Sequence, residues 1–307
     1  MRVLTISLTN GKQTLSIGGN DEITNYNYDV TVNGSKFMSA LKDNCVVTVS
    51  NLSYDVIVRI IKTKQYSIEV KCGYKDSSLI TIFKGEVLYI SDVLEADRTH
   101  TAVIICASSL LAKYGQSRMN ITLNSNINLY TAIKYISRRS GINSEDISKR
   151  LKLNILQDSK TGNETAASWL NRLMNENEYL AINTDGTKNS VFSIFDTRQG
   201  PKRIIKLNSS FINLDGGYPK LTKDGLSLSI MPTFDFMCGD VIQIDNSLID
   251  ISARATNEVK ENRGYYIDKE GYYMIFEIAY TLENHGNTFS VSLNCKSYSR
   301  ISNYIND

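Results

Sequence analysis

The sequence predicts a mainly β protein in which two antiparallel β-barrels flank a small α+β domain. Apolar and polar residues alternate in the first and last thirds of the chain, which is typical of half-buried strands. The middle third instead has apolar residues at helical spacing, preceded by capping residues. Because 307 residues suit two or three domains, we expect domains at residues 1–108, 109–202 and 203–307. Alternatively, part of 203–238 completes the first barrel.

Strands dominate the first third. In Tyr66–Tyr74, large apolar residues alternate with Ser, Glu and Lys, as expected for a strand with one buried face. Apolar residues three and four apart predict a helix at Leu52–Lys62, with Asn51 as its N-cap. The other expected strands, with a bulge or bend at Lys84-Gly85, are Arg2–Leu8, Glu22–Val32, Cys45–Ser50, Leu79–Phe83, Glu86–Ser91 and Thr99–Ser108.

Helical signals appear in the middle third. Asn128 is expected to cap a helix that ends near Gly141, and a short helix fits Ser144–Leu151. A third helix is expected to begin at the capping-box pattern Thr161-x-x-Glu164. Its apolar face consists of Ala166, Trp169, Leu170, Leu173 and Met174, and a hairpin follows from Tyr179–Asn183 and Val191–Asp196 with a turn at Asp185-Gly186.

The last third returns to strands. Leu226–Met231 and Val241–Asp245 are expected strands, with Pro232 and Gly239 in the connection between them. Two alternating runs, Met274–Leu282 and Phe289–Cys295, are separated by a short turn. They predict a hairpin with one buried face.

The charge of the chain argues against a dedicated nucleic-acid binder. The formal net charge is only +2, whereas such proteins carry a clear basic excess. We interpret one local basic cluster as a solvated helical face, because carboxylates interrupt it. It contains Arg138, Arg139, Lys149, Arg150 and Lys152, with Glu145 and Asp146 between them.

The cysteines indicate a reducing environment. They are five in number, widely spaced and without a Cys-x-x-Cys pair, so neither a zinc site nor a redox pair is suggested. Buried free thiols fit assembly in a reducing cytoplasm. The N-terminus lacks the apolar core of a signal peptide, and no run of about 18 apolar residues occurs, so we expect no membrane insertion. The cysteines are Cys45, Cys72, Cys106, Cys238 and Cys295.

Catalytic motifs are missing from the sequence. The two histidines, His100 and His285, lie in no His-Glu-x-x-His pattern, and neither a Gly-x-Ser-x-Gly elbow nor a phosphate-binding loop occurs. We therefore predict a protein that is not an enzyme, with no catalytic, cofactor-binding or metal-ligating residues. Carboxylates that the sequence leaves open as a glycosidase pair are Glu176 with Glu178, and Asp92 with Glu95 and Asp97.

Tyrosine is frequent, with 18 residues against 9 phenylalanines. Tyr265, Tyr266, Tyr272 and Tyr273 cluster around two glycines near the C-terminus. Exposed tyrosines of this kind suit a protein or carbohydrate contact surface. Alternatively, they fill strand faces at the rim of a barrel.

The order of these features resembles the baseplate hub proteins of contractile phage tails and related injection systems, in particular the tail-tube-like, late-control-protein-like hubs. The likeness covers nearly the whole chain and depends on the order and spacing of short motifs. In the first two thirds these motifs are Cys72-Gly73-Tyr74, Ile82–Val87, Thr101–Cys106, Asn128–Ser140, Glu164–Leu173 and Tyr179–Asn183. In the last third they are Phe211–Pro219, Leu226–Pro232, Cys238–Ile242, Gly271–Ile275 and His285-Gly286-Asn287.

The resemblance implies a homotrimer in which each subunit supplies two tail-tube-like barrels to a pseudo-sixfold ring. Such a ring adapts the hexameric tail tube to the trimeric central spike and lets DNA pass during ejection. The implied partners are the tail tube protein, the central spike protein, inner baseplate wedge proteins and the tape-measure protein, without sequence-specific nucleic-acid binding. The implied location is the tail baseplate of the virion. The alternative from the residues is a carbohydrate-binding tail-tip protein that uses the Tyr265–Tyr273 surface.

Overall fold

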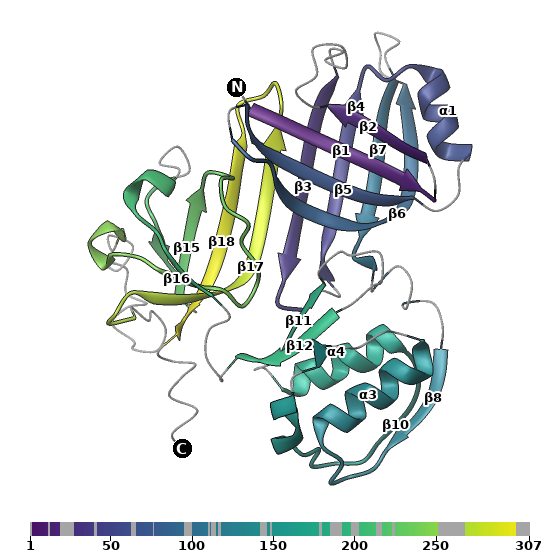
Figure 1. Cartoon of the computed structure of the whole chain (residues 1–307), viewed down its shortest axis with the longest axis vertical. Coiled ribbons are helices and arrows are strands. Elements are labelled where there is room, and N and C mark those ends of the chain that lie inside the picture. The colour runs from purple at the N-terminus through teal and green to yellow at the C-terminus, as the bar shows by residue number, and fades with distance from the viewer. Residues whose placement is uncertain are drawn as a thin grey trace, which may run out of the picture.

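The chain forms three units in the computed structural model: an N-terminal β unit (residues 2–107), a middle unit (118–197) and a C-terminal β unit (203–297) (Figure 1). Strands dominate, so the predicted mainly β fold class is confirmed. The predicted domain boundaries stay predictions. The structure describes residues 2–11, 13–18, 28–39, 42–62, 66–75, 77–94, 100–109, 111, 115, 118–141, 146–147, 149–177, 180–184, 192–197, 203–212, 217–222, 225–250 and 268–298.

The N-terminal β unit forms because its strands bury one face. In β5, for example, Ile68, Val70 and Cys72 are buried whereas the residues between them are not. The strand order β3-β4-β7-β6-β5-β1-β2 is antiparallel throughout. The elements of the unit are β1 (Arg2–Asn10), β2 (Gln13–Gly18), β3 (Asp29–Phe37), β4 (Asn44–Ser50), α1 (Tyr54–Lys62), β5 (Ser67–Tyr74), β6 (Ile80–Leu94) and β7 (His100–Ala107).

Two predictions for this unit need correction. The predicted N-cap Asn51 has φ of 65°, and α1 begins three residues later, where the carbonyl of Ser53 accepts the N–H of Val56 at 3.0 Å. Two residues of types that favour N-capping, Asn51 and Ser53, precede the helix, and the helix starts directly after the second of them. The strand predicted at Glu22–Val32 is observed from Asp29, where β3 begins, and β3 continues five residues beyond Val32. The rest of that prediction lies outside the described residues.

Strand β6 turns the sheet through a corner. Its first half pairs with β5 and its second half with β7, with a register shift between Val87 and Tyr89. Gly85 permits a close approach at this bend, because a Cβ there would lie 2.2 Å from the carbonyl oxygen of Ala107. The two strands predicted on either side of Lys84-Gly85 are therefore one bent strand.

The C-terminal β unit continues the same sheet. The predicted final hairpin is confirmed as β17 paired with β18, and β17 also pairs along its other edge with β3, from Glu277 opposite Phe37 to Glu283 opposite Thr31. This β3–β17 seam joins the two β units. The strands of the unit are β13 (Ile204–Lys206), β14 (Lys220–Leu221), β15 (Gly225–Ile230), β16 (Val241–Gln243), β17 (Tyr272–Glu283) and β18 (Phe289–Ser297).

The middle unit packs two helices against short strands. The side-chain oxygen of Asn128 accepts the N–H of Thr131 at 2.8 Å, and Gly141 ends the helix with φ of 70°, so both predicted caps of α3 are confirmed. The predicted hairpin is present as β11 and β12. The elements are β8 (Arg118–Leu123), α3 (Leu129–Ser140), β9 (Asp146–Ile147), the 3-10 helix η2 (Lys149–Leu153), β10 (Lys160–Thr165), α4 (Ala166–Glu176), β11 (Leu180–Thr184) and β12 (Phe192–Asp196).

Two helix predictions in this unit are wrong in part. The residues of the capping-box pattern form β10, which pairs with β8, and the true N-cap of α4 is Thr165, whose hydroxyl accepts the N–H of Ser168 at 3.1 Å. Pairing between distant strands therefore overrides the local capping signal. In the segment predicted as the helix Ser144–Leu151, the structure instead has the short strand β9 and the start of η2.

The buried apolar residues form two separate cores. One core is shared by the N-terminal and C-terminal β units, and the other lies within the middle unit around Trp169, which is completely buried. The predicted apolar face of α4 lies in this second core. All five cysteines are free and buried, as expected from the sequence.

Candidate assembly surfaces

An exposed apolar surface lies on the outer face of β6 and β7. Tyr89 stands directly opposite Ile105, and the two are 60% and 39% exposed. Val93 lies on the same face, four residues further along β6, and Val46 of β4 flanks Ile105 on its other side. We call Val46, Tyr89, Val93 and Ile105 the outer patch. Val46 is half-buried and the other three side chains are exposed, and exposed apolar side chains gathered on one face are typical of sites of protein interaction.

The outer patch exists because β7 is apolar on both faces. Ala102, Ile104 and Cys106 point into the shared core, and Val103 and Ile105 alternate with them on the outside. The sequence analysis did not identify this surface. The signal that was available is the unbroken apolar run from Ala102 to Ala107, which is longer than a strand with one solvated face needs.

A short neck connects the N-terminal β unit to the middle unit. The N–H of Ile182 in β11 donates to the carbonyl of Met38 at 2.7 Å. Close by, the carboxylate of Asp43 accepts the N–H of Phe37 at 2.8 Å. Burial raises the pKa of Asp43 to about 7, although this hydrogen bond and the charge of Lys36 act to lower it. The neck therefore contains a carboxyl group that titrates near neutral pH.

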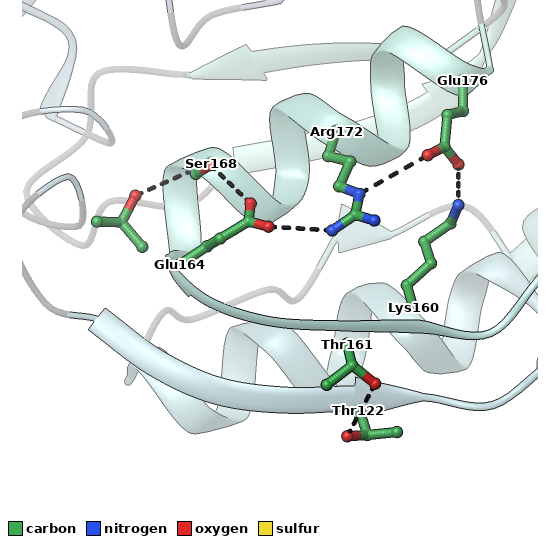
Figure 2. Close-up of polar contacts among 8 residues, drawn as sticks. Thr122, Lys160, Thr161, Glu164, Ser168, Arg172 and Glu176 are labelled. Carbon is green, nitrogen blue, oxygen red and sulfur yellow. Dashed lines mark hydrogen bonds and ion pairs between the residues drawn. The ribbon is translucent and has the colours of Figure 1, made fainter.

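An ionic network fixes α4 onto β10 (Figure 2). The ammonium of Lys160, which is nearly buried, pairs with Glu176. Arg172 pairs with Glu164 at 3.0 Å and with Glu176 at 3.8 Å, and Glu164 also accepts the hydroxyl of Ser168 at 2.8 Å. The alternation of charges along these two elements holds the helix in place, and we assign the network a structural role.

Part of the surface of the middle unit is basic. Four exposed or half-exposed cations, Lys134, Arg138, Lys149 and Lys152, lie on α3 and η2, and the ammonium groups of Lys134 and Lys152 lie over the ring of Tyr130. These residues include three members of the basic cluster that we interpreted as a solvated face. Of the carboxylates that interrupt this cluster, Glu145 and the side chain of Asp146 lie outside the described residues.

The tyrosine cluster does not form one exposed surface in the described residues. Tyr273 is completely buried, and its hydroxyl donates to the side chain of Asn246 at 3.3 Å and accepts the N–H of Asp268 at 3.2 Å. Tyr272 is half-buried at the start of β17, and Tyr265 and Tyr266 lie outside the described residues. Tyr273 therefore cannot bind a carbohydrate as the alternative interpretation requires.

The candidate carboxylates do not assemble into a catalytic pair where the structure describes them. Glu176 belongs to the ionic network, and Asp92 pairs with His100 at 2.9 Å. His285 is exposed in the turn between β17 and β18. Within the described residues, no group of His, Cys, Asp and Glu side chains suits a metal ion, and no helix has the length and apolarity to cross a membrane. Glu95, Asp97 and Glu178 lie outside the described residues.

Comparison with known proteins relates the fold to tail and secretion machinery. No family model and no curated protein matches the sequence. Among solved structures, the 43 kDa tail protein of prophage MuSo2 from Shewanella oneidensis superimposes with a TM-score of 0.58 at 8% identity. The match spans 97% of this chain and 98% of that protein.

Two further solved structures match the chain with the same TM-score. An E. coli component of the type VI secretion system, itself similar to the T4 bacteriophage tail proteins gp27 and gp5, matches with a TM-score of 0.58 at 11% identity, over 89% of this chain and 75% of that one. A chain of the Francisella PdpA–VgrG complex matches with a TM-score of 0.58 at 9% identity, over 97% of this chain and 58% of that one. These superpositions establish a shared fold, so the resemblance inferred from the sequence is confirmed at the level of the fold. The three structures are named as a tail protein, a component of the type VI secretion system and a complex that contains VgrG.

Proposed function

We propose that this chain, which has the fold of phage-tail and type VI secretion proteins, is the structural hub of a contractile-tail baseplate. In this role three copies form a pseudo-sixfold ring between the hexameric tail tube and the trimeric central spike, and DNA passes through the ring during ejection. The expected partners are the tube protein, the spike protein and the inner baseplate proteins, with the tape-measure protein as a further contact.

One observation carries this proposal. The likeness to the prophage tail protein extends over 97% of this chain and 98% of that one, so it covers all three units rather than one common barrel. Proteins that share a single domain differ in the rest of their chains, whereas here the order of units is shared as well. The structures that contain VgrG or resemble gp5 and gp27 support a spike as a partner.

The two β units suit a ring of this symmetry. The β3–β17 seam holds them side by side in one sheet with one core, so each copy presents a rigid pair. Three rigid pairs around one axis place six β units in a ring. The outer patch supplies an apolar surface for the contact between copies, which is needed because ring closure must bury surface.

The first test is the mass of the purified chain by light scattering, with electron-microscopy class averages of the same sample. The expected result is three times the 34.5 kDa chain mass and an open ring with apparent sixfold features. If the chain alone is a monomer, the measurement is repeated after co-expression with the spike protein. A compact monomer under both conditions would refute the hub assignment.

Variants of the outer patch sharpen this test. The double variant Tyr89→Ser/Ile105→Ser removes the apolar pair at its centre, and we expect loss of the ring while the single chain still unfolds in a cooperative transition, because neither side chain belongs to the buried core. Tyr218→Ser is the matched control, since Tyr218 is 61% exposed in the C-terminal β unit. A ring that survives the double variant would show that the copies contact one another elsewhere.

A further inference from the structure

Basic and apolar side chains converge on one face of the middle unit, from two elements. Tyr130, Lys134 and Arg138 follow one another at intervals of four residues along α3, so they form one stripe. Lys149 and Lys152 are three residues apart in η2 and therefore also share a face. The ammonium of Lys134 lies 4.7 Å and that of Lys152 lies 5.3 Å from the centre of the Tyr130 ring, so the two stripes meet there.

The positive charge on this face lacks counter-charges where the structure describes the chain. None of the four cations forms an ion pair within the described residues, in contrast to Lys160 and Arg172 of the ionic network. Residues 130–152 contain six Lys and Arg against two Asp and Glu, an excess larger than the net charge of +2 of the whole chain. Hydrogen bonding from Lys134 lowers the pKa of the Tyr130 hydroxyl, and the charges of Lys134, Lys152 and Lys149 add to this effect.

Helix stability does not explain the position of these lysines. Lys152 lies over Tyr130 in the first turn of α3, the positive end of the helix dipole, where a cation is unfavourable. The first turn of α3 also has no acidic residue. Arg138, by contrast, lies in the last turn, where a cation is favourable.

Exposed apolar side chains directly follow the cations in the chain. Leu153, the last residue of η2 and the neighbour of Lys152 in the sequence, is 80% exposed, and Ile155 is 57% exposed. The chain holds them at this position because residues 153–156 run along the start of α3: the N–H of Leu129 donates to the carbonyl of Asn154 at 2.8 Å, and Ile155 is bridged to Asn128. Such apolar anchors rimmed by charges are typical of protein contact surfaces.

We propose that this basic face, composed of Tyr130, Lys134, Arg138, Lys149, Lys152 and Leu153, binds an acidic segment of a partner protein that also carries an apolar residue. Carboxylates of the segment pair with the four cations, and its apolar residue covers Leu153 and Ile155. A nucleic acid fits less well, because phosphates do not match the two aliphatic side chains and the whole chain lacks a basic excess. The proposal is independent of the trimeric ring, since the face lies on the middle unit.

The test measures fluorescence anisotropy of a labelled 16-residue peptide with the repeat Glu-Glu-Leu-Glu, titrated with the full chain at low salt. A 20-base-pair DNA duplex and a peptide with Ser in place of Leu serve as comparison probes. We expect saturable binding of the first peptide that weakens with added salt, and at least fivefold weaker binding of the other two probes. DNA binding that equals or exceeds peptide binding, or no saturable binding of the peptide, would overturn the proposal.

Charge reversal locates the binding. Lys134→Glu/Lys152→Glu is expected to weaken peptide binding at least tenfold, and Leu153→Ser at least threefold for the Leu-containing peptide only. The matched control is Lys62→Glu/Lys75→Glu, which makes the same charge change at exposed lysines of the N-terminal β unit. Unchanged Trp169 fluorescence shows that the middle unit is folded in each variant. Equal weakening by both double variants would refute a specific site.

Discussion

The buried carboxyl group of Asp43 makes the stability of the protein depend on pH near neutrality. Asp43 is only 7% exposed, and burial raises its pKa from the ordinary value for aspartate to about 7. In the unfolded chain the group titrates near the ordinary value of about 3.9. Between these two pH values the folded state therefore binds a proton that the unfolded state has released.

The sign of the effect follows from this difference. Where the folded state binds more protons than the unfolded state, stability falls as the pH rises. Below about pH 4, Asp43 is protonated in the folded and in the unfolded state, and its contribution to stability is fully present. As the pH rises from about 4 to about 7, the unfolded chain releases this proton while the folded protein keeps it, so the free energy of unfolding falls. A difference of about three pKa units corresponds to about 4 kcal/mol over this window.

Substituting Asp43→Asn removes the titration while keeping an acceptor for the N–H of Phe37. We expect the variant and the original protein to have similar free energies of unfolding near pH 4. Near pH 8 the variant is expected to be more stable by about 4 kcal/mol, because it buries no charge. Other carboxylates titrate equally in both proteins, so their contributions cancel in the difference.

The assay is urea denaturation monitored by far-UV circular dichroism, which reports on the β units, at several pH values between 4 and 8. Fluorescence of Trp169 in the same samples follows the middle unit separately. A difference between variant and original protein that stays constant across the pH range would refute the reasoning, because it would mean that Asp43 titrates at its ordinary pKa. If the original protein instead became more stable than the variant as the pH rises, the charge of Lys36 would lower the pKa of Asp43 by more than burial raises it.

Three further predictions concern packing and thiol chemistry. Gly85→Ala is expected to destabilise the protein by about 1–3 kcal/mol in urea denaturation, since its Cβ would lie 2.2 Å from the carbonyl oxygen of Ala107; an unchanged midpoint would show that β6 relaxes without cost. Trp169→Ala is expected to lower the unfolding free energy of the middle unit by about 3–5 kcal/mol, measured by circular dichroism, because the indole is completely buried. Burial raises the pKa of Cys45 and of Cys72 to about 12, so neither thiol should react with a disulfide reagent at pH 8 until urea unfolds the chain; fast labelling of the folded protein would contradict this burial.

Sequence periodicity was sufficient for elements that bury one face and solvate the other. Strand β5 and the hairpin β17–β18 were predicted to within two residues at each end, because along most of their length every second side chain enters the core. The alternation fails at the start of β17, where Tyr273, Met274 and Ile275 are all buried beside a register shift. Periodicity was insufficient where distant pairing decides the structure. Thr161 and Glu164 have the spacing of a capping box, but β8 lies beside them and makes the segment a strand.

The same distinction applies to the candidate surfaces. Arg138, Lys149 and Lys152 were recognised in the sequence as members of a basic cluster, whereas Lys134 was not. The position of Leu153 next to this face depends on the backbone contact between Leu129 and Asn154. The outer patch depends on which face of β7 enters the core, and a run that is apolar on both faces does not reveal this. Alternation also says nothing about the partner of a strand, so the pairing of β3 with β17 was not predicted.

The β3–β17 seam has a consequence for the order in which the protein folds. Its two strands lie at opposite ends of the chain, with the whole middle unit between them. During synthesis the N-terminal β unit leaves the ribosome with one edge of β3 exposed until the C-terminal hairpin has emerged, a long-range contact of the kind that slows folding. The middle unit has its own core and completes it earlier. The nascent chain therefore has an interval in which an unpaired strand edge needs protection from aggregation.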